Sequence, residues 1–264
     1  MTTERSPQRA DGWTAAVRQR LGLGRLLPLG GPEDAAWIAE TAAASVLRGA
    51  AGPGAVLGTL RIGPAREASG TGTWPGGPAG ARAGAAAGPA LPPVPPSGLP
   101  PGPLRIEAEF RAAGDRPLPD SAAALRTALV TAAAARLGLE VAEVDLRVTA
   151  LLDDGASEQV TAPPEAASSA PAPSVPVAKA DGPAGEAASA VPGVVSLTRV
   201  LGSAVHTAED HIRIEVATAG DHRALDVARS VRTAVSAATA DRLPVSVLVT
   251  EVVERGAGGR SVGR

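Results

Sequence analysis

Three histidines with acidic neighbours are the residues of this chain best suited to chemistry. The group comprises His206, His211, His222, Glu209, Asp210 and Asp221. Imidazole and carboxylate groups bind metals and transfer protons, but a zinc site needs three or four ligands that converge on one point. The spacing matches no established ligand motif. Two interpretations stay open: a metal or small-molecule site in this region, or solvated turn residues and helix caps.

The local sequence indicates how these histidines would be placed. Residues 207–210 read Thr-Ala-Glu-Asp between two apolar runs, a pattern that predicts a hairpin turn. His206 and His211 flank this turn and could face each other across it. His222 begins the next predicted helix, so its side chain would have to converge with the other two.

Other candidate groups give weaker indications of a catalytic or binding site. No serine lies in a Gly-x-Ser-x-Gly nucleophile elbow, which needs a turn from a predicted strand into a predicted helix. Glu107 and Glu109 fall on the predicted outer face of a strand, where carboxylates are solvated. Arg126 and Arg232 recur at matching positions of two predicted helices, which indicates either a shared salt bridge or assembly contact, or two surface arginines. We assign no catalytic residue, no cofactor ligand and no metal ligand.

Composition narrows the class of protein. The chain has 264 residues, a net charge of −2 and no cysteine, which excludes disulfides and thiolate metal sites. The weak negative charge argues against a general nucleic-acid binder. Lys179 is the only lysine, and arginine, alanine, glycine and proline abound, a bias typical of GC-rich bacterial genomes. No apolar run is long enough to span a membrane, and the N-terminus does not resemble a signal peptide.

Short motifs recur in the same order in the two halves of the chain. Residues 104–107, 125–128 and 146–149 read LRIE, LRTA and LRVT, whereas 212–215, 231–234 and 247–250 read IRIE, VRTA and VLVT. Alternating apolar residues predict strands at the first and third motifs, and helical spacing predicts a helix at the second. We therefore expect an α+β fold of two related small modules, each ordered helix-strand-strand-helix-strand.

The first module is expected at 32–152. Its predicted elements are a helix from Pro32 to about Ala51, with Trp37 and Ile38 on its apolar face, a strand over 55–62, a strand over 104–110, a helix from 120 or 121 to 137, and a strand over 144–150. Gly138 is the expected end of the second helix. The second module is expected at 191–253, without a full leading helix.

Stretches rich in proline, alanine and glycine join and interrupt the modules. Such segments cannot bury enough apolar surface to offset chain entropy. We predict a disordered insertion at about 64–103 within the first module, a disordered linker over 153–190, and a disordered tail over 254–264.

Residues 1–31 form a predicted leader with one short amphipathic helix. Trp13, Ala16, Val17 and Leu21 share one face of this helix, and the first 25 residues carry more arginines than carboxylates. A basic amphipathic helix can lie on a membrane surface or dock on a partner. The alternative is a helix that packs on its own domain.

The order of elements resembles the alkaline-shock, or envelope stress response, protein family of Gram-positive bacteria. The resemblance rests on the Pro-Gly turns at 53–54 and 192–193, the alternating strands at 104–110 and 212–216, and the closing strands at 141–151 and 245–252. The chain departs from the family pattern at Asp145 and Ser246, where the family usually has asparagine. The two copies are degenerate and together cover roughly half to three-fifths of the chain.

The resemblance implies a non-catalytic scaffold or interaction protein. Such a protein would act through self-association and through protein partners, either a small membrane anchor or a paralogue. It would bind no nucleic acid and contact the membrane only indirectly, as a cytoplasmic protein at the inner face. The alternative is a small-molecule or metal-binding protein that uses the region of His206, His211 and His222.

Overall fold

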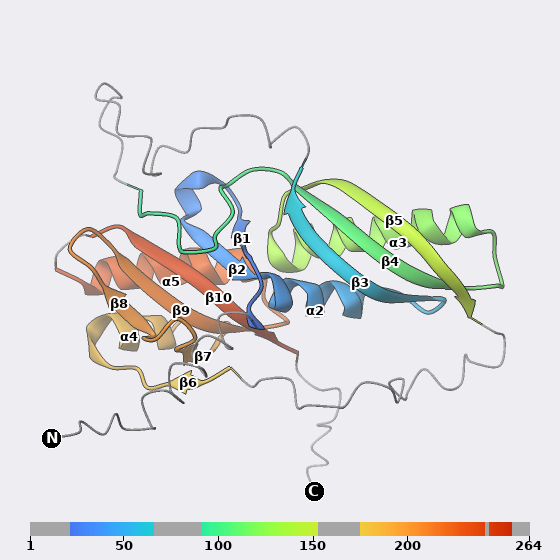
Figure 1. Cartoon of the computed structure of the whole chain (residues 1–264). Helices are drawn as coiled ribbons and strands as arrows, with labels where there is room; N and C mark the ends of the chain where they lie inside the picture. Colours follow the sequence, from blue (N-terminus) through green and yellow to red (C-terminus); the bar gives the residue numbers. More distant parts are fainter. Residues whose placement is uncertain (1–21, 66–90, 153–174, 241–242, 255–264) are drawn as a thin grey trace, which may run out of the picture.

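The computed structural model describes residues 22–65, 91–152, 175–240 and 243–254 and has a mixed α+β fold. Its strands form two sheets, one of three strands and one of seven, with helices packed beside them (Figure 1). The predicted leader helix and the tail from 255 onward lie outside the described residues. No helix in the described part is long and apolar enough to cross a membrane.

The smaller sheet consists of β3 (Ala55–Pro64), β4 (Leu104–Ala113) and β5 (Val141–Leu152) in that order. β3 and β4 pair antiparallel, whereas β4 and β5 pair parallel. Every second residue of β4 is buried, as the alternation of apolar and charged residues predicts. The three strands therefore lie where the sequence predicted them, and the long connection 65–103 joins two neighbouring strands.

Helices α2 (Glu40–Ala50) and α3 (Leu118–Ala132) contact this sheet. One further turn, of π type, extends α3 through Ala133–Leu137. Gly138 then adopts a left-handed conformation with φ of 90°, which glycine adopts at low cost. The predicted end of this helix is confirmed.

The larger sheet combines strands from residues 26–39 with strands from residues 177–253. Its order is β1-β2-β10-β9-β7-β6, and β8 pairs with β9 beside β7. The strands are β1 (Leu26–Leu29), β2 (Ala36–Ala39), β6 (Val177–Ala178), β7 (Val194–Thr198), β8 (Val205–Thr207), β9 (Ile212–Ala219) and β10 (Val245–Val253). Helices α4 (Gly182–Ser189) and α5 (Ala224–Ala238) pack on each other and on this sheet.

The predicted helix from Pro32 to Ala51 is wrong in its first half. Pro32–Asp34 form a single 3-10 turn, Ala35 takes a left-handed conformation, and Ala36–Ala39 then form β2. β2 pairs parallel with β10, more than two hundred residues away. This pairing buries Trp37 and Ile38 in a sheet, and nothing in the local sequence distinguishes such a short apolar run from a helix.

Two segments predicted to be disordered contain ordered structure. In the predicted insertion, residues 97–99 bind β1: Leu26 N donates to Ser97 O, and Leu99 N donates to Leu26 O. In the predicted linker, residues 177–189 form β6 and α4, and Ala188 is fully buried. Alanine provides enough apolar surface here because α5 covers it. A helix of eight residues therefore precedes the segment 191–253, within what was predicted to be linker.

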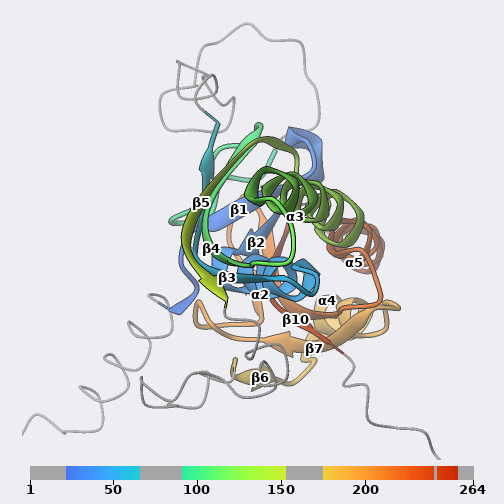
Figure 2. The ribbon, with the colours of Figure 1, turned by 90° about the vertical axis from the view of Figure 1, so that its right-hand side faces the viewer.

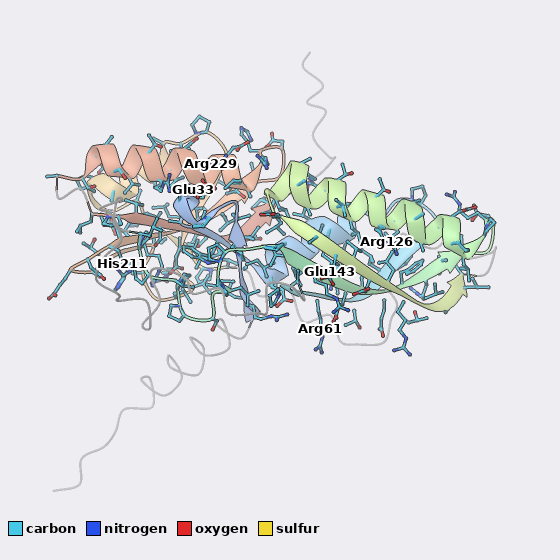
Figure 3. All side chains as sticks on the ribbon, turned by 90° about the horizontal axis from the view of Figure 1, so that it is seen from above. Glu33, Arg61, Arg126, Glu143, His211 and Arg229 are labelled. Carbon is cyan, nitrogen blue, oxygen red and sulfur yellow. The ribbon has the colours of Figure 1, made fainter. Side chains whose placement is uncertain are left out.

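The C-terminal end of α3 meets the N-terminal end of α5, so the two helices lie in one row beside the sheets (Figures 2 and 3). Arg223 Nε donates to Ala134 O at 2.9 Å, and Arg136 binds Gly220 O and the carboxylate of Glu254. Leu225 packs closely on Gly138. A Cβ atom added to Gly138 would lie 2.4 Å from the Cβ atom of Leu225. The two halves of the described chain therefore share one continuous hydrophobic core.

Candidate interaction surface

The structure brings two of the three histidines together. β8 and β9 form the predicted hairpin, although its first strand spans Val205–Thr207 rather than 200–205. The rings of His206 and His211 lie 6.2 Å apart across it. His211 Nδ1 lies 2.7 Å from Asp210 Oδ1, and this hydrogen bond lowers the pKa of Asp210.

His222 lies far from this pair. Ile212 pairs with Thr207 at the start of β9, whereas His222 follows Ala219 at its other end. At about 3.3 Å per residue, the strand separates the two positions by roughly 25 Å. Within the described ranges, no group of three or more His, Cys, Asp or Glu side chains could hold a metal ion. The three histidines therefore do not converge on one point, as a shared metal site would require, and His222 contacts Asp221.

The acidic and basic residues of the smaller sheet pair with one another on its outer face. Glu107 lies 3.1 Å from Arg105, and Glu109 lies 3.9 Å from Arg147. These carboxylates do not share a site, and their side chains are 54% and 40% exposed, so they are solvated as the sequence indicated.

The recurring arginines make different contacts. Arg126 Nε donates to Val144 O on β5 at 3.3 Å. Arg232 instead donates to the carbonyl of Glu33, at the start of the chain's described part. Each of these contacts is made to a carbonyl oxygen, and the two carbonyls lie in unrelated elements, so the contacts do not form the shared salt bridge that was one of the interpretations.

Asp34 is a buried carboxylate that sequence reasoning placed only in the first turn of a helix. Arg229 on α5 donates to it from Nε at 2.7 Å and from a terminal nitrogen at 2.9 Å, and Gly31 N donates at 2.9 Å. Burial alone would raise the pKa of Asp34, but the hydrogen bonds from Arg229 and Gly31 outweigh it and lower the pKa. Asp34 therefore fixes the 3-10 turn to α5.

Glu40 connects β1, α2 and β3. Its carboxylate accepts hydrogen bonds from Ile62 N at 3.0 Å and from Arg25 N at 3.2 Å. Burial opposes ionisation of Glu40, yet the hydrogen bonds from Ile62 and Arg25 lower its pKa. The charged form thus stabilises the edge of the smaller sheet against the start of the larger one.

Glu215 is fully buried in β9. Its carboxylate accepts from Val200 N at 2.7 Å and from Leu201 N at 3.1 Å, and Arg213 lies 3.6 Å away. These donors form the turn between β7 and β8. Asp34, Glu40 and Glu215 thus each hold separate segments of the chain together by hydrogen bonds to their carboxylates. Only the three-dimensional structure reveals these contacts.

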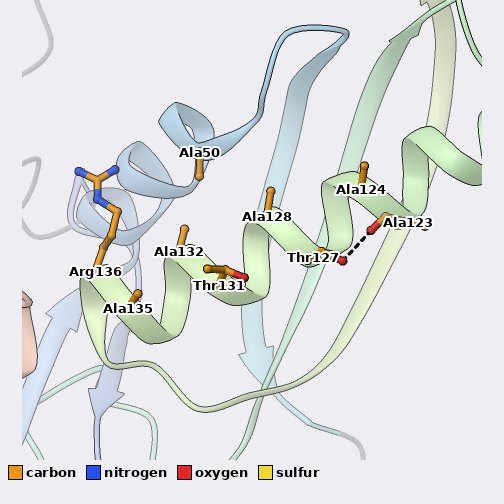
Figure 4. A pocket seen from close by; sticks show the side chains of 9 residues that line it. All are labelled: Ala50, Ala123, Ala124, Thr127, Ala128, Thr131, Ala132, Ala135 and Arg136. Atoms are coloured by element: carbon orange, nitrogen blue, oxygen red, sulfur yellow. Dashed lines mark hydrogen bonds between the residues drawn. The ribbon is translucent and has the colours of Figure 1, made fainter.

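The outward face of α3 is unusually apolar for an exposed helix. Alanine and threonine from α3, with Ala50 of α2 and Arg136, line an open hollow of about 740 Å³ (Figure 4). Ala123, Ala124, Thr127 and Thr131 are exposed. The Thr127 hydroxyl donates to Ala123 O at 3.0 Å, so even this polar group is satisfied within the helix.

Helix α5 provides a comparison within the same chain. Its exposed residues include Asp226, Arg229, Ser230, Thr233 and Ser236, the polar face expected of a solvated helix. Thr233 Oγ1 donates to Arg229 O at 3.0 Å, as Thr127 does to Ala123. The two threonines occupy the same place in the recurring motif, but only Thr127 lies on an apolar face.

Comparisons with protein-family models, with curated proteins and with solved structures found no match.

Proposed function

We propose that this protein is a non-catalytic scaffold that works by binding other protein chains. The observation that carries the proposal is the apolar outward face of α3 beside α2. Exposed helix faces of soluble domains are normally polar, and a contiguous apolar hollow on a surface is typical of a binding site for another chain. Small side chains allow the axis of a second helix to approach closely.

The roles of the ionisable groups support this proposal. Asp34, Glu40 and Glu215 are saturated by backbone N–H groups and arginines of the same chain. A catalytic carboxylate normally faces a cleft that substrate can enter. Structural hydrogen bonds within the chain thus account for the lowered pKa values of Asp34 and Glu40.

We further infer that the chain contains two copies of one module. β3, β4 and β5 are joined as antiparallel and then parallel neighbours, with α3 as the crossover. β7, β9 and β10 have the same order and directions, with α5 as the crossover. The recurring motifs fall on equivalent elements of the two sets, which supports duplication.

The likeness to the alkaline-shock, or envelope stress response, family supplies the expected partner. In this proposal the hollow on α3 receives a helix of a small membrane-anchor protein or of a paralogue. The protein would then lie in the cytoplasm, held at the inner face of the membrane by that partner rather than by a membrane span of its own.

Fractionation of cells that express the full chain tests this function. We expect part of the wild-type protein in the membrane pellet, from which high pH releases it as a peripheral protein. Thr127→Glu places a charge in the apolar hollow, so this variant should move to the soluble fraction. Thr233→Glu is the matched control, because it adds the same charge at the equivalent threonine of α5.

The proposal fails if wild-type protein is wholly soluble, or if the two variants distribute alike. Circular dichroism and thermal unfolding of both purified variants establish that each is folded.

A further inference from the structure

The strand edges in the described ranges differ sharply in how they are protected. β1 is covered by residues 97–99, and the edge of β3 is capped where Ile62 N donates to Glu40. β6 and β8 are only two and three residues long. Short, covered or capped edges resist pairing with another chain.

β5 has the longest open edge in the described ranges. It is twelve residues long and pairs on one side only, with β4. Val148 and Leu151 on this strand are 37% and 59% exposed. Leu104 N donates to Glu140 O, so the backbone groups of Leu104, and by alternation those of Ile106, point at β5. In a parallel pair the residue opposite such a position directs its own backbone groups away, and Val144 lies opposite Ile106. Because these directions alternate along a strand, the backbone groups of Leu146 and Val148 point outward as well.

The sequence of β5 has a two-fold pattern centred on Leu146. Its inner-face residues lie opposite the buried residues of β4, and two irregularities of the ladder place them at positions 141, 144, 146, 148 and 151. These positions are symmetric about 146. An antiparallel pair of two β5 strands centred there would align Val144 with Val148 and Val141 with Leu151.

The charges follow the same symmetry. In this register Asp145 of each copy lies directly opposite Arg147 of the other, on the outer face of the sheet. Asp145 binds Arg105, and Arg147 lies 3.9 Å from Glu109 of the same chain. Their side chains remain 53% and 81% exposed, so each can also meet the opposite charge of a second copy. Opposite charges across an antiparallel pair stabilise it, and like charges destabilise it.

We propose that two copies of this chain pair antiparallel through β5, with the two-fold axis at Leu146, and form a continuous six-stranded sheet. Leu146, Val144 and Val148 supply the outward N–H and C=O groups that join the copies. A carbonyl oxygen accepts two hydrogen bonds, so Arg126 can remain on Val144. The pairing adds self-association to the proposed scaffold function. Its role in the cell rests on that proposed function, whereas its geometry rests on β5 alone.

Light scattering of the full chain over a range of concentrations tests the pairing. The wild-type mass should rise from 26.1 kDa towards twice that value. Arg147→Glu would place like charges opposite each other twice, so the dimer dissociation constant should rise about ten-fold or more. Arg111→Glu is the matched control, because it makes the same charge change on the outer face of the central strand β4, and it should leave the constant unchanged.

A single introduced cysteine tests the register, since the chain has none of its own. Leu146→Cys should form a disulfide-linked dimer under mild oxidation, because directly opposed residues lie within disulfide reach. Val195→Cys, at an exposed position of β7, should form no disulfide-linked dimer under the same conditions.

A wild-type mass of 26.1 kDa at every concentration overturns the pairing. So does a dimer that is insensitive to Arg147→Glu and yields no cross-link at position 146. In either case, membrane recovery that is lost in Thr127→Glu would leave the scaffold function standing.

Discussion

The carboxylates of Asp34, Glu40 and Glu215 accept hydrogen bonds from backbone N–H groups that lie close in space. Each carboxylate also joins segments that are separated in sequence, and Asp34 binds Arg229 across 195 positions. A sequence pattern cannot reveal such a contact, because both residues are ordinary helix-end and helix-surface types. The histidines show the converse: the hairpin between His206 and His211 could be predicted locally, whereas the position of His222 depends on the length of β9.

At this scale we predict that Asp34→Asn lowers the free energy of unfolding by about 2 kcal/mol at pH 7, since a buried charged hydrogen-bond acceptor is lost. The pKa of Asp34 is lowered in the folded state. Its contribution to stability is therefore present above its unfolded pKa of about 3.9 and is lost as the pH falls through the folded value. Urea unfolding at pH 7 and pH 3 measures the difference between wild type and variant.

This difference should be smaller at pH 3 than at pH 7. The neighbouring Glu33→Gln serves as a control, because Glu33 is exposed, and it should change stability little at either pH. An unchanged difference between wild type and Asp34→Asn across this range would refute the role of the ionised carboxylate.

At the scale of helices and strands, the sequence pattern predicted those features that neighbouring residues determine. The strand alternation of β4 and the helix end at Gly138 could be predicted because neighbouring residues specify them. β2 could not, because a four-residue apolar run becomes a strand only when β10 lies beside it. α4 was missed for a similar reason: its alanines look like linker sequence until α5 covers them. The surface on α3 could not be predicted either, since apolar helix residues at the sequence level indicate burial.

The junction between α3 and α5 gives an element-scale prediction. Gly138→Ala should lower the free energy of unfolding by roughly 2 kcal/mol or more, because a positive φ is strained for alanine and its Cβ would collide with Leu225. Gly202→Ala has a positive φ but open space, so it should cost about 1 kcal/mol from strain alone. Thermal and denaturant unfolding measure both.

Gly114→Ala is the baseline for this series, since no atom lies within 4 Å of the new Cβ and its φ is not in the left-handed region. If the three variants were equally stable, α3 and α5 would not be packed end to end as described.

At the scale of the whole molecule, the two halves differ most in what they present outward. The half with α5 has a polar helix face and short strand edges. The half with α3 has an alanine-lined hollow on its helices and an open edge at β5. If the halves are copies of one module, as we propose, the copies have diverged in the surfaces they expose. The apolar helix face and the open strand edge then belong to the copy with α3.

Hydrogen–deuterium exchange of the full chain, in dilute and in concentrated solution, tests directly whether these surfaces bind another chain. Open-edge amides exchange fast unless a strand pairs with them. Concentration should therefore slow exchange in peptides that cover 144–148, while peptides that cover the turn at 208–211 exchange at the same rate. If the β5 peptides exchange equally fast at both concentrations, the account of this half as an assembly surface is contradicted.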